Sequence, residues 1–258
     1  MKKIKCLLKK DLTSIFRAKK FLIIFLVLIG FAIVSPISAK IVQELLKLFG
    51  EDLGELSALL GTATYIDSYV QLNGNLAEMF IFILIIMFAS SIIKEKTSGT
   101  YLVLKMNGIN KREFILSHVV AQLIVVTISY FLSIIVFLVT TYILFKAAFP
   151  THWFYSLISL YLFIVFFVIM INFISNFSKS TTQSMVLNFS FYFGILMLNM
   201  FSKIKYFIPS SLTDNVVSVL DGSITKECNI SIISTFIWII GLILILMLGT
   251  KEKISNKN

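Results

Sequence analysis

The residues of this chain that could do chemistry are few, and most of them are polar rather than ionisable. Its 258 residues include two histidines, His118 and His152, and two cysteines, Cys6 and Cys228. These four do not stand at the short spacings of a metal site. No segment has the form G-x-x-x-x-G-K-[S/T], so hydrolysis of ATP by that nucleotide-binding loop is excluded. We therefore predict no catalytic, cofactor or metal site, and we expect that the chain is not an enzyme.

Uncharged amides within apolar segments are the candidates for a substrate path. We select Asn172, Asn188 and Asn199, because an amide in hydrocarbon needs a hydrogen-bond partner from another helix or from a cargo. The alternative is plain hydrogen bonding between helices, worth about 0.6 to 2 kcal/mol each, and for any single residue it is the default. The apolar cores contain no ionisable residue of the kind that marks proton or sodium coupling, which argues against a secondary transporter.

The hydrophilic segment 94–113 is the second candidate site. A charged helix end at Lys94-Glu95-Lys96 is followed by a break at Gly99-Thr100 and a short apolar helix through Leu104. A turn is then predicted at Asn107-Gly108, and Asn110 is predicted to cap a new helix. This pattern indicates a short helix that lies across the inner face of a membrane between two spans. The alternative is a solvated loop that only connects them.

Membrane spans are the elements that must position these residues. Apolar residues make up 58% of the chain and charged ones 14%, and the mean hydropathy is +0.94, which excludes a soluble domain. Because a span takes about 20 apolar residues, we predict six, at 21–39, 76–93, 119–145, 153–174, 183–201 and 230–249. The fold class is therefore all-α integral membrane protein, and Lys40 to Asn75 forms an external cap or an extended helix end.

Residues 1–20 are predicted to be an amphipathic helix that lies at the membrane interface, and 21–258 a single membrane domain. Apolar Ile4, Leu8, Leu12 and Ile15 share one face of this helix, while Lys2, Lys5, Lys9 and Arg17 share another. The alternative is a basic flank that only orients the first span. That span is expected to kink or end near Ser35-Pro36, because proline disrupts a helix.

The distribution of charge predicts the orientation. The net charge is +10, and most of the 23 basic residues lie in segments that are cytoplasmic if the amino terminus is inside, whereas most of the 13 acidic residues lie in the others. This is the positive-inside pattern, and it places both termini in the cytoplasm. It also explains the basic composition by anionic lipid rather than by nucleic acid. Cys6 and Cys228 then lie on opposite sides and cannot pair.

Segment 94–113 resembles the first coupling element of ABC-2-type transporter permeases, the membrane subunits of bacterial ABC exporters. The shared residues, in the family's order, are Glu95, Gly99-Thr100, Leu102, Leu104 and Lys111-Arg112-Glu113. The chain departs at Thr97, Gly108 and His118, where the family commonly has an acidic residue, proline and lysine. The amphipathic amino-terminal segment, the six spans and the basic tail agree with the same family.

The resemblance implies a permease subunit that works with a second permease chain, identical or a sibling, and with two separate ATPase subunits that bind ATP and Mg²⁺. It implies no cofactor in this chain and no nucleic-acid partner, and it implies a bacterial cell membrane as the location. The residues that it marks for ATPase coupling are Glu95, Gly99, Thr100, Leu102, Leu104, Lys111 and Arg112. Because the fifth span lines the dimer interface in that family, Asn188 is the first choice for a substrate path.

The expected cargo is an amphipathic or hydrophobic molecule, of which an antimicrobial or cytolytic peptide is one example. The alternative function is a non-transporting membrane immunity or scaffold protein that binds a peptide in the bilayer. Copurification with an ATPase distinguishes the two, because only the permease requires that partner.

Overall fold

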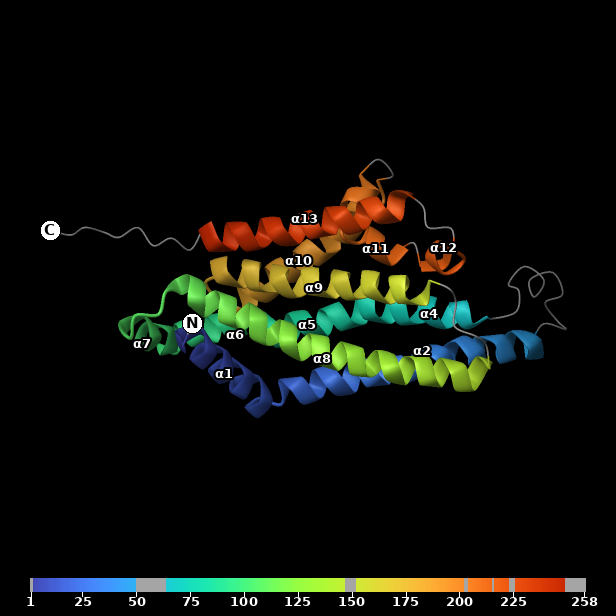
Figure 1. Ribbon diagram of the computed structural model, residues 1–258, viewed down its shortest axis with the longest axis horizontal. Helices are drawn as coiled ribbons and strands as arrows, with labels where there is room; N and C mark the ends of the chain where they lie inside the picture. Colours follow the sequence, from blue (N-terminus) through green and yellow to red (C-terminus); the bar gives the residue numbers. More distant parts are fainter. Residues whose placement is uncertain are drawn as a thin grey trace.

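The computed structural model describes residues 2–49, 64–146, 152–201, 204–214, 216–222 and 226–248, which form helices and no strand. Long helices run side by side along the bundle (Figure 1): α2 (Lys20–Phe49), α8 (Lys111–Phe145), α9 (Trp153–Phe177) and α13 (Lys226–Leu248). A further long segment is built from α4 (Tyr65–Asn75), a π-helical turn (Leu76–Phe80), α5 (Ile81–Phe88) and α6 (Ser91–Thr97). Shorter pieces, η2 (Lys205–Phe207), α11 (Ser211–Asp214) and α12 (Val216–Leu220), precede α13.

Within the described part of the chain, five helical segments are long and apolar enough to cross a membrane: Lys20–Val42, Tyr65–Thr97, Lys111–Phe145, Trp153–Phe177 and Lys226–Leu248. They coincide with five of the six predicted spans. The predicted span 183–201 corresponds to α10 (Thr181–Leu198), an 18-residue helix that contains Gln183 and Asn188 and is not among the five. The all-α, multi-pass membrane fold is confirmed, and the sixth crossing stays a prediction.

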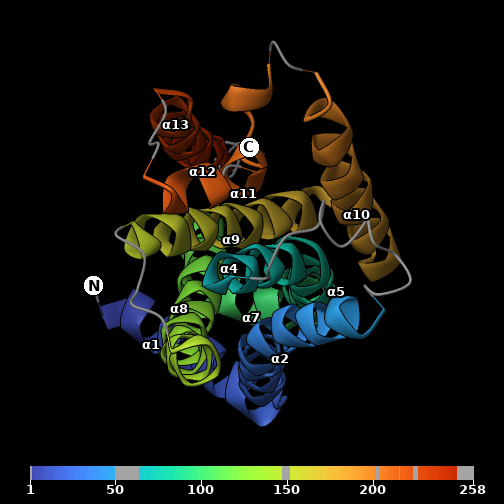
Figure 2. The same cartoon turned by 90° about the vertical axis from the view of Figure 1, so that its right-hand side faces the viewer.

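Helix α9 lies at the centre of the bundle. It packs between α8 and α13, and the end-on view shows it crossing between these layers (Figure 2). Its Phe163, Phe166 and Phe167 side chains are fully buried and pack ring against ring. Because lipid tails are as apolar as these rings, their stabilising effect comes from close contact rather than from removal from water.

The prediction that the first span ends near Ser35-Pro36 is wrong. Helix α2 continues through Pro36 to Phe49. The hydroxyl of Ser35 donates to the Phe31 carbonyl at 2.7 Å and accepts from the Asn75 amide at 3.0 Å. These bonds do not replace the one to the Ala32 carbonyl that Pro36 cannot make, but they lie where α4 packs against α2 beside the proline. Residues 40–49 of the predicted external segment are thus a helix end, and 50–63 lie outside the described residues.

Helix α1 (Lys2–Arg17) and helix α7 (Thr100–Met106) lie at the same end of the bundle (Figure 1). The chain turns between α1 and α2 at Lys19, whose φ of +56° interrupts the helix. The buried face of α1 carries Leu7, Asp11 and Ile15 and packs against α8. Part of the apolar face of α1 is therefore used inside the protein, and an acidic residue lies in the middle of it.

Candidate functional site

Helix α7 is set off from α6 by a backbone turn at Gly99. This residue has φ of +77°, and the Leu102 and Val103 amides donate to its carbonyl at 2.9 and 3.1 Å. The hydroxyls of Ser98 and Thr100 pair across the turn at 2.9 Å. A Cβ at Gly99 would meet no atom within 4 Å. The requirement for glycine is therefore one of backbone conformation, because other residues lose about 1–2 kcal/mol in the left-handed region.

The other end of α7 has the two hydrogen bonds of a Schellman motif around Gly108, whose φ is +74°. The Gly108 backbone amide donates to the Lys105 carbonyl at 2.9 Å, and the Ile109 backbone amide donates to the Leu104 carbonyl at 3.1 Å. Helix α8 then begins with the Asn110 amide donating to the Glu113 carboxylate at 3.0 Å. The Lys3 ammonium of α1 donates to the Gly108 carbonyl at 3.0 Å. The predicted succession of break, helix, turn and cap is the one observed.

The two leucines that were expected to act together face in different directions. Leu102 is 62% exposed, and Val103 (59%) and Met106 (80%) extend the same exposed apolar surface. We refer to these three residues as the α7 surface. Leu104 instead packs against the core together with Tyr101. Of the predicted pair, Leu102 is the one that a partner could contact without unfolding α7.

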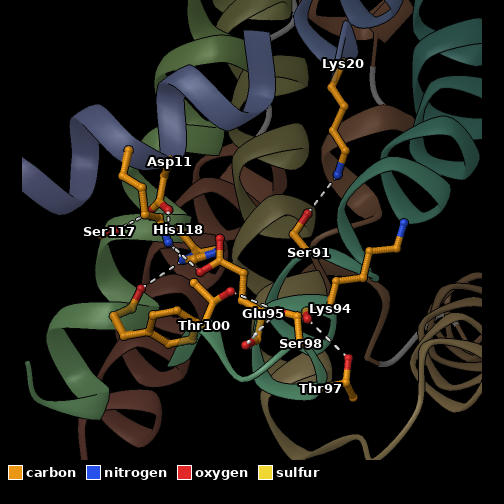
Figure 3. A network of polar contacts seen from close by, with 12 residues as sticks. Asp11, Lys20, Ser91, Lys94, Glu95, Thr97, Ser98, Thr100, Ser117 and His118 are labelled. Atoms are coloured by element: carbon orange, nitrogen blue, oxygen red, sulfur yellow. Dashed lines mark hydrogen bonds and ion pairs between the residues drawn. The ribbon is translucent and has the colours of Figure 1, made fainter. Parts of the chain in front are cut away.

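Four charged or ionisable side chains from α1, α6 and α8 meet at the base of α7, and we call them the ion cluster: Lys10, Asp11, Glu95 and His118. The His118 Nδ1 atom lies 3.3 Å from Asp11 Oδ2, and its Nε2 atom lies 3.4 Å from Glu95 Oε1. The Lys10 ammonium pairs with Asp11 Oδ1 at 3.0 Å and with Glu95. Figure 3 shows Asp11, Glu95 and His118 pointing toward one another, while Lys94 and Thr97 point away.

The ion cluster also contains the kinds of ligand that bind metals. One ligand atom from each of Asp11, Glu95 and His118 lies within 4.8 Å of the others. However, Asp11 approaches one ring nitrogen of His118 and Glu95 the other, so the three do not converge on one point. The Lys10 ammonium already contacts both carboxylates. The contacts among the four side chains form an ion network between three helices.

Helix α6 makes side-chain hydrogen bonds or ion pairs with α1, α2, α8 and α9. The Lys20 ammonium of α2 donates to Ser91 Oγ at 3.0 Å, and the Lys96 ammonium donates to the Asn176 carbonyl of α9 at 2.9 Å. Lys10 of α1 and His118 of α8 hold Glu95. A polar pocket of about 190 Å³ opens beside these contacts, lined by Asp11, Lys20, Glu95, His118 and Gln122 among others. A displacement of α6 therefore acts on four other helices.

The predicted coupling residues thus divide into two groups. Thr100 and Leu102 are exposed, whereas Glu95, Gly99, Leu104, Lys111 and Arg112 are partly buried. Sequence reasoning missed Lys10, Asp11, Val103 and Met106. One signal could have revealed Asp11: it is an acidic residue in a strongly basic segment, spaced four residues from both Leu7 and Ile15 on the face of a helix.

The three predicted substrate-path amides do not come together. Asn172 Nδ2 donates to Gln122 Oε1 of α8 at 2.7 Å. Asn188 donates within its own helix to the Ser184 carbonyl at 2.8 Å, and Asn199 ends α10 and donates to Asp214. An open cleft of about 640 Å³ lies between α9 and α10, and apart from Ser190 and Gly194 it is lined by apolar side chains that include Phe173, Phe177, Leu187 and Phe191.

Comparison with known proteins adds one match. A family model described as ABC-2 family transporter protein matches residues 6–217. The matched region includes most of α1, the ion cluster, α7 and four of the five segments that could span a membrane. No match is found among curated proteins.

Proposed function

Since the chain belongs to the family of ABC-2 transporter proteins, we propose that it is the permease subunit of an ATP-binding-cassette exporter. It pairs with a second permease chain, identical or a sibling, and with two ATPase subunits that bind ATP and Mg²⁺. It catalyses no reaction itself and needs no cofactor. It lies in a bacterial cell membrane with both termini in the cytoplasm, the side on which the ATPase subunits bind.

The observation that carries this proposal is the α7 surface. A short, ordered helix with exposed Leu102, Val103 and Met106 fits an apolar groove on a partner protein. Helix α7 is joined through Gly99 to α6, the end of one membrane segment, and through Gly108 to α8, the start of the next. A movement of the bound ATPase would therefore be passed directly to two membrane segments.

We further propose that the cargo is amphipathic or hydrophobic, with a cytolytic peptide as one example. The apolar cleft between α9 and α10 supports this class, because its lining offers contact area and few polar partners. The proposed path includes Asn188 of α10, whose amide is held by its own helix. A change of Asn188 to leucine is expected to alter transport or cargo preference while leaving assembly intact.

The test is copurification of ABC ATPase subunits from the same cell with tagged permease variants. Leu102→Asp places a charge in an apolar contact and is expected to weaken binding at least about tenfold. Leu102→Met keeps the contact apolar and is the matched control. Leu102 lies outside the buried core, so the membrane insertion of the two variants should be equal. Full ATPase binding by Leu102→Asp would refute the coupling role of α7.

The same experiment decides against the immunity or scaffold alternative. If the wild-type chain protects cells from a peptide while no ATPase copurifies with it or stimulates its activity, the exporter proposal is wrong. An ATPase that copurifies, and whose hydrolysis of ATP is changed by the Leu102→Asp substitution, supports it.

A further inference from the structure

We propose that His118 is a proton-dependent latch, which in its doubly protonated form fastens α6, and with it α7, to α1 and α8. The latch concerns the ion cluster inside this chain and needs no partner protein. It can therefore be tested separately from the proposed exporter function.

Each ring nitrogen of His118 faces oxygen atoms of neighbouring residues. His118 Nδ1 lies 3.0 Å from the Phe114 carbonyl oxygen and 3.3 Å from Asp11 Oδ2, and Nε2 lies 3.4 Å from Glu95 Oε1. A neutral imidazole carries one N–H, so only one of the two nitrogens could donate to its carboxylate. The imidazolium carries two, and each can then be directed at a carboxylate.

The charges of the ion cluster balance when His118 is protonated. Asp11 and Glu95 bring two negative charges, and Lys10 together with a protonated His118 brings two positive ones. His118 and Asp11 are only 5% and 3% exposed, so an uncompensated charge at either residue is poorly screened by water. Loss of the histidine proton leaves the cluster with one net negative charge and removes one of the two His118 contacts to a carboxylate, while the Lys10–Glu95 pair between α1 and α6 remains.

The groups that face His118 come from every helix packed against it. They are Lys10 and Asp11 from α1, Glu95 from α6, and Phe114 and Ser117 from α8, with Ser117 donating to Asp11. Tyr101 of α7 packs its ring on Phe114, which in turn packs on the imidazole. Lys20 of α2 and Gln122 of α8 line the adjoining polar pocket, through which water and protons can reach the cluster.

The sign of the effect follows from these contacts. The latch needs the histidine proton, so it is closed toward low pH and opens as the pH rises through the midpoint of His118. The closed latch also requires that both carboxylates are ionised, since a protonated carboxyl group would not balance the charge of the imidazolium. Over a titration from about pH 5.5 to 8.5, the protonation state of His118 therefore decides whether both of its ring nitrogens or only one can donate to a carboxylate.

The first experiment is ¹⁵N NMR of histidine-labelled chain in lipid nanodiscs. The chain has two histidines, so a His152→Gln background leaves His118 as the one signal. We expect the His118 ring to be protonated at both nitrogens at the acidic end of the titration and to lose one proton within the pH range tested. Glu95→Gln should move the transition toward lower pH, because the imidazolium loses a negatively charged partner, whereas the matched control Glu227→Gln, on α13, should leave it unchanged. A ring that holds one protonation state throughout, or a midpoint insensitive to Glu95→Gln, overturns the proposal.

The second experiment is hydrogen exchange of residues 94–106, compared with a His118→Lys variant at each pH so that intrinsic exchange rates cancel. Lysine keeps the positive charge at every pH. The ratio of the wild-type exchange rate to that of His118→Lys should therefore be near one at the acidic end and rise several-fold above the midpoint of His118. His118→Phe should exchange faster than His118→Lys at every pH. A ratio that does not change with pH overturns the latch, even if ATPase binding through Leu102 is intact.

Discussion

The base of α7 and the centre of the bundle are held together by different forces. At the base of α7, α6 is joined to α1, α2, α8 and α9 by ion pairs and lysine hydrogen bonds. At the centre, Phe163, Phe166 and Phe167 of α9 pack against one another and against Tyr192. Aromatic packing has no chemical state to change, whereas an ionic contact depends on protons. The region that we propose to meet a partner is thus the one whose attachment depends on protonation in the proposed latch.

The largest effect should come from the apolar centre. Phe167→Ala removes a fully buried ring that contacts Phe163 at 4.9 Å and Tyr192 at 5.6 Å between centroids. We expect a loss of about 3–5 kcal/mol in free energy of unfolding, measured by SDS titration in mixed micelles. Phe154→Ala on the same helix removes a ring that is mostly exposed and should cost less than about 1 kcal/mol. Equal losses would mean that α9 is not packed as described.

A somewhat smaller loss should follow removal of one charge from the ion cluster. Asp11→Asn leaves Lys10 and His118 with Glu95 alone, and we expect a loss of about 3 kcal/mol. The pair between Lys205 and Asp214 is 3.1 Å long but about one-third exposed at both side chains, so Asp214→Asn should cost less than about 1 kcal/mol. The two variants are compared in the same SDS titration. A cost for Asp11→Asn no greater than that of Asp214→Asn would show that burial does not strengthen the cluster.

Removal of a neutral hydrogen bond between two helices should cost less stability than removal of a buried ring or a buried charge. Asn172→Leu breaks the 2.7 Å bond to Gln122 and should cost about 1 kcal/mol. Because the Gln122 amide is then left without its partner, the double variant with Gln122→Leu should cost less than the sum of the two single changes. If the cost of the double variant equals the sum of the two single costs, the Asn172–Gln122 bond does not contribute to stability, and the Asn172 amide would be available to a cargo.

The smallest effects concern glycines, and their sign should differ between the two regions. Gly99→Ala forces a side chain into a left-handed conformation at the start of α7 and should destabilise that turn by about 1 kcal/mol. Gly241 lies within α13 with no atom near its missing Cβ, so Gly241→Ala should stabilise by roughly 0.5–1 kcal/mol. Hydrogen exchange of residues 99–106 and of α13 reports each change locally. Faster exchange in both segments would contradict the assignment.

Local rules account for what the sequence could predict. The long apolar segments, the break at Gly99-Thr100, the turn at Asn107-Gly108 and the cap at Asn110 each depend on residues within a few positions of one another. Helix periodicity, positive φ and capping are properties of such short stretches. The same local rule failed at Pro36, because the continuation of a membrane helix through proline depends on its surroundings. Here α2 packs against α4, and Ser35 is hydrogen-bonded to Asn75, 40 positions away.

The sequence by itself therefore determined an all-α membrane protein with a short helix at the base of two spans. Only the tertiary structure decided that Leu104 faces inward while Leu102 stays exposed, and that Lys10, Asp11, Glu95 and His118 form one cluster. The physical reason is that α1, α6 and α8 bring together side chains more than 80 positions apart, and no local pattern records such a meeting. Asp11 was not singled out from the sequence, because its partners lie on other helices.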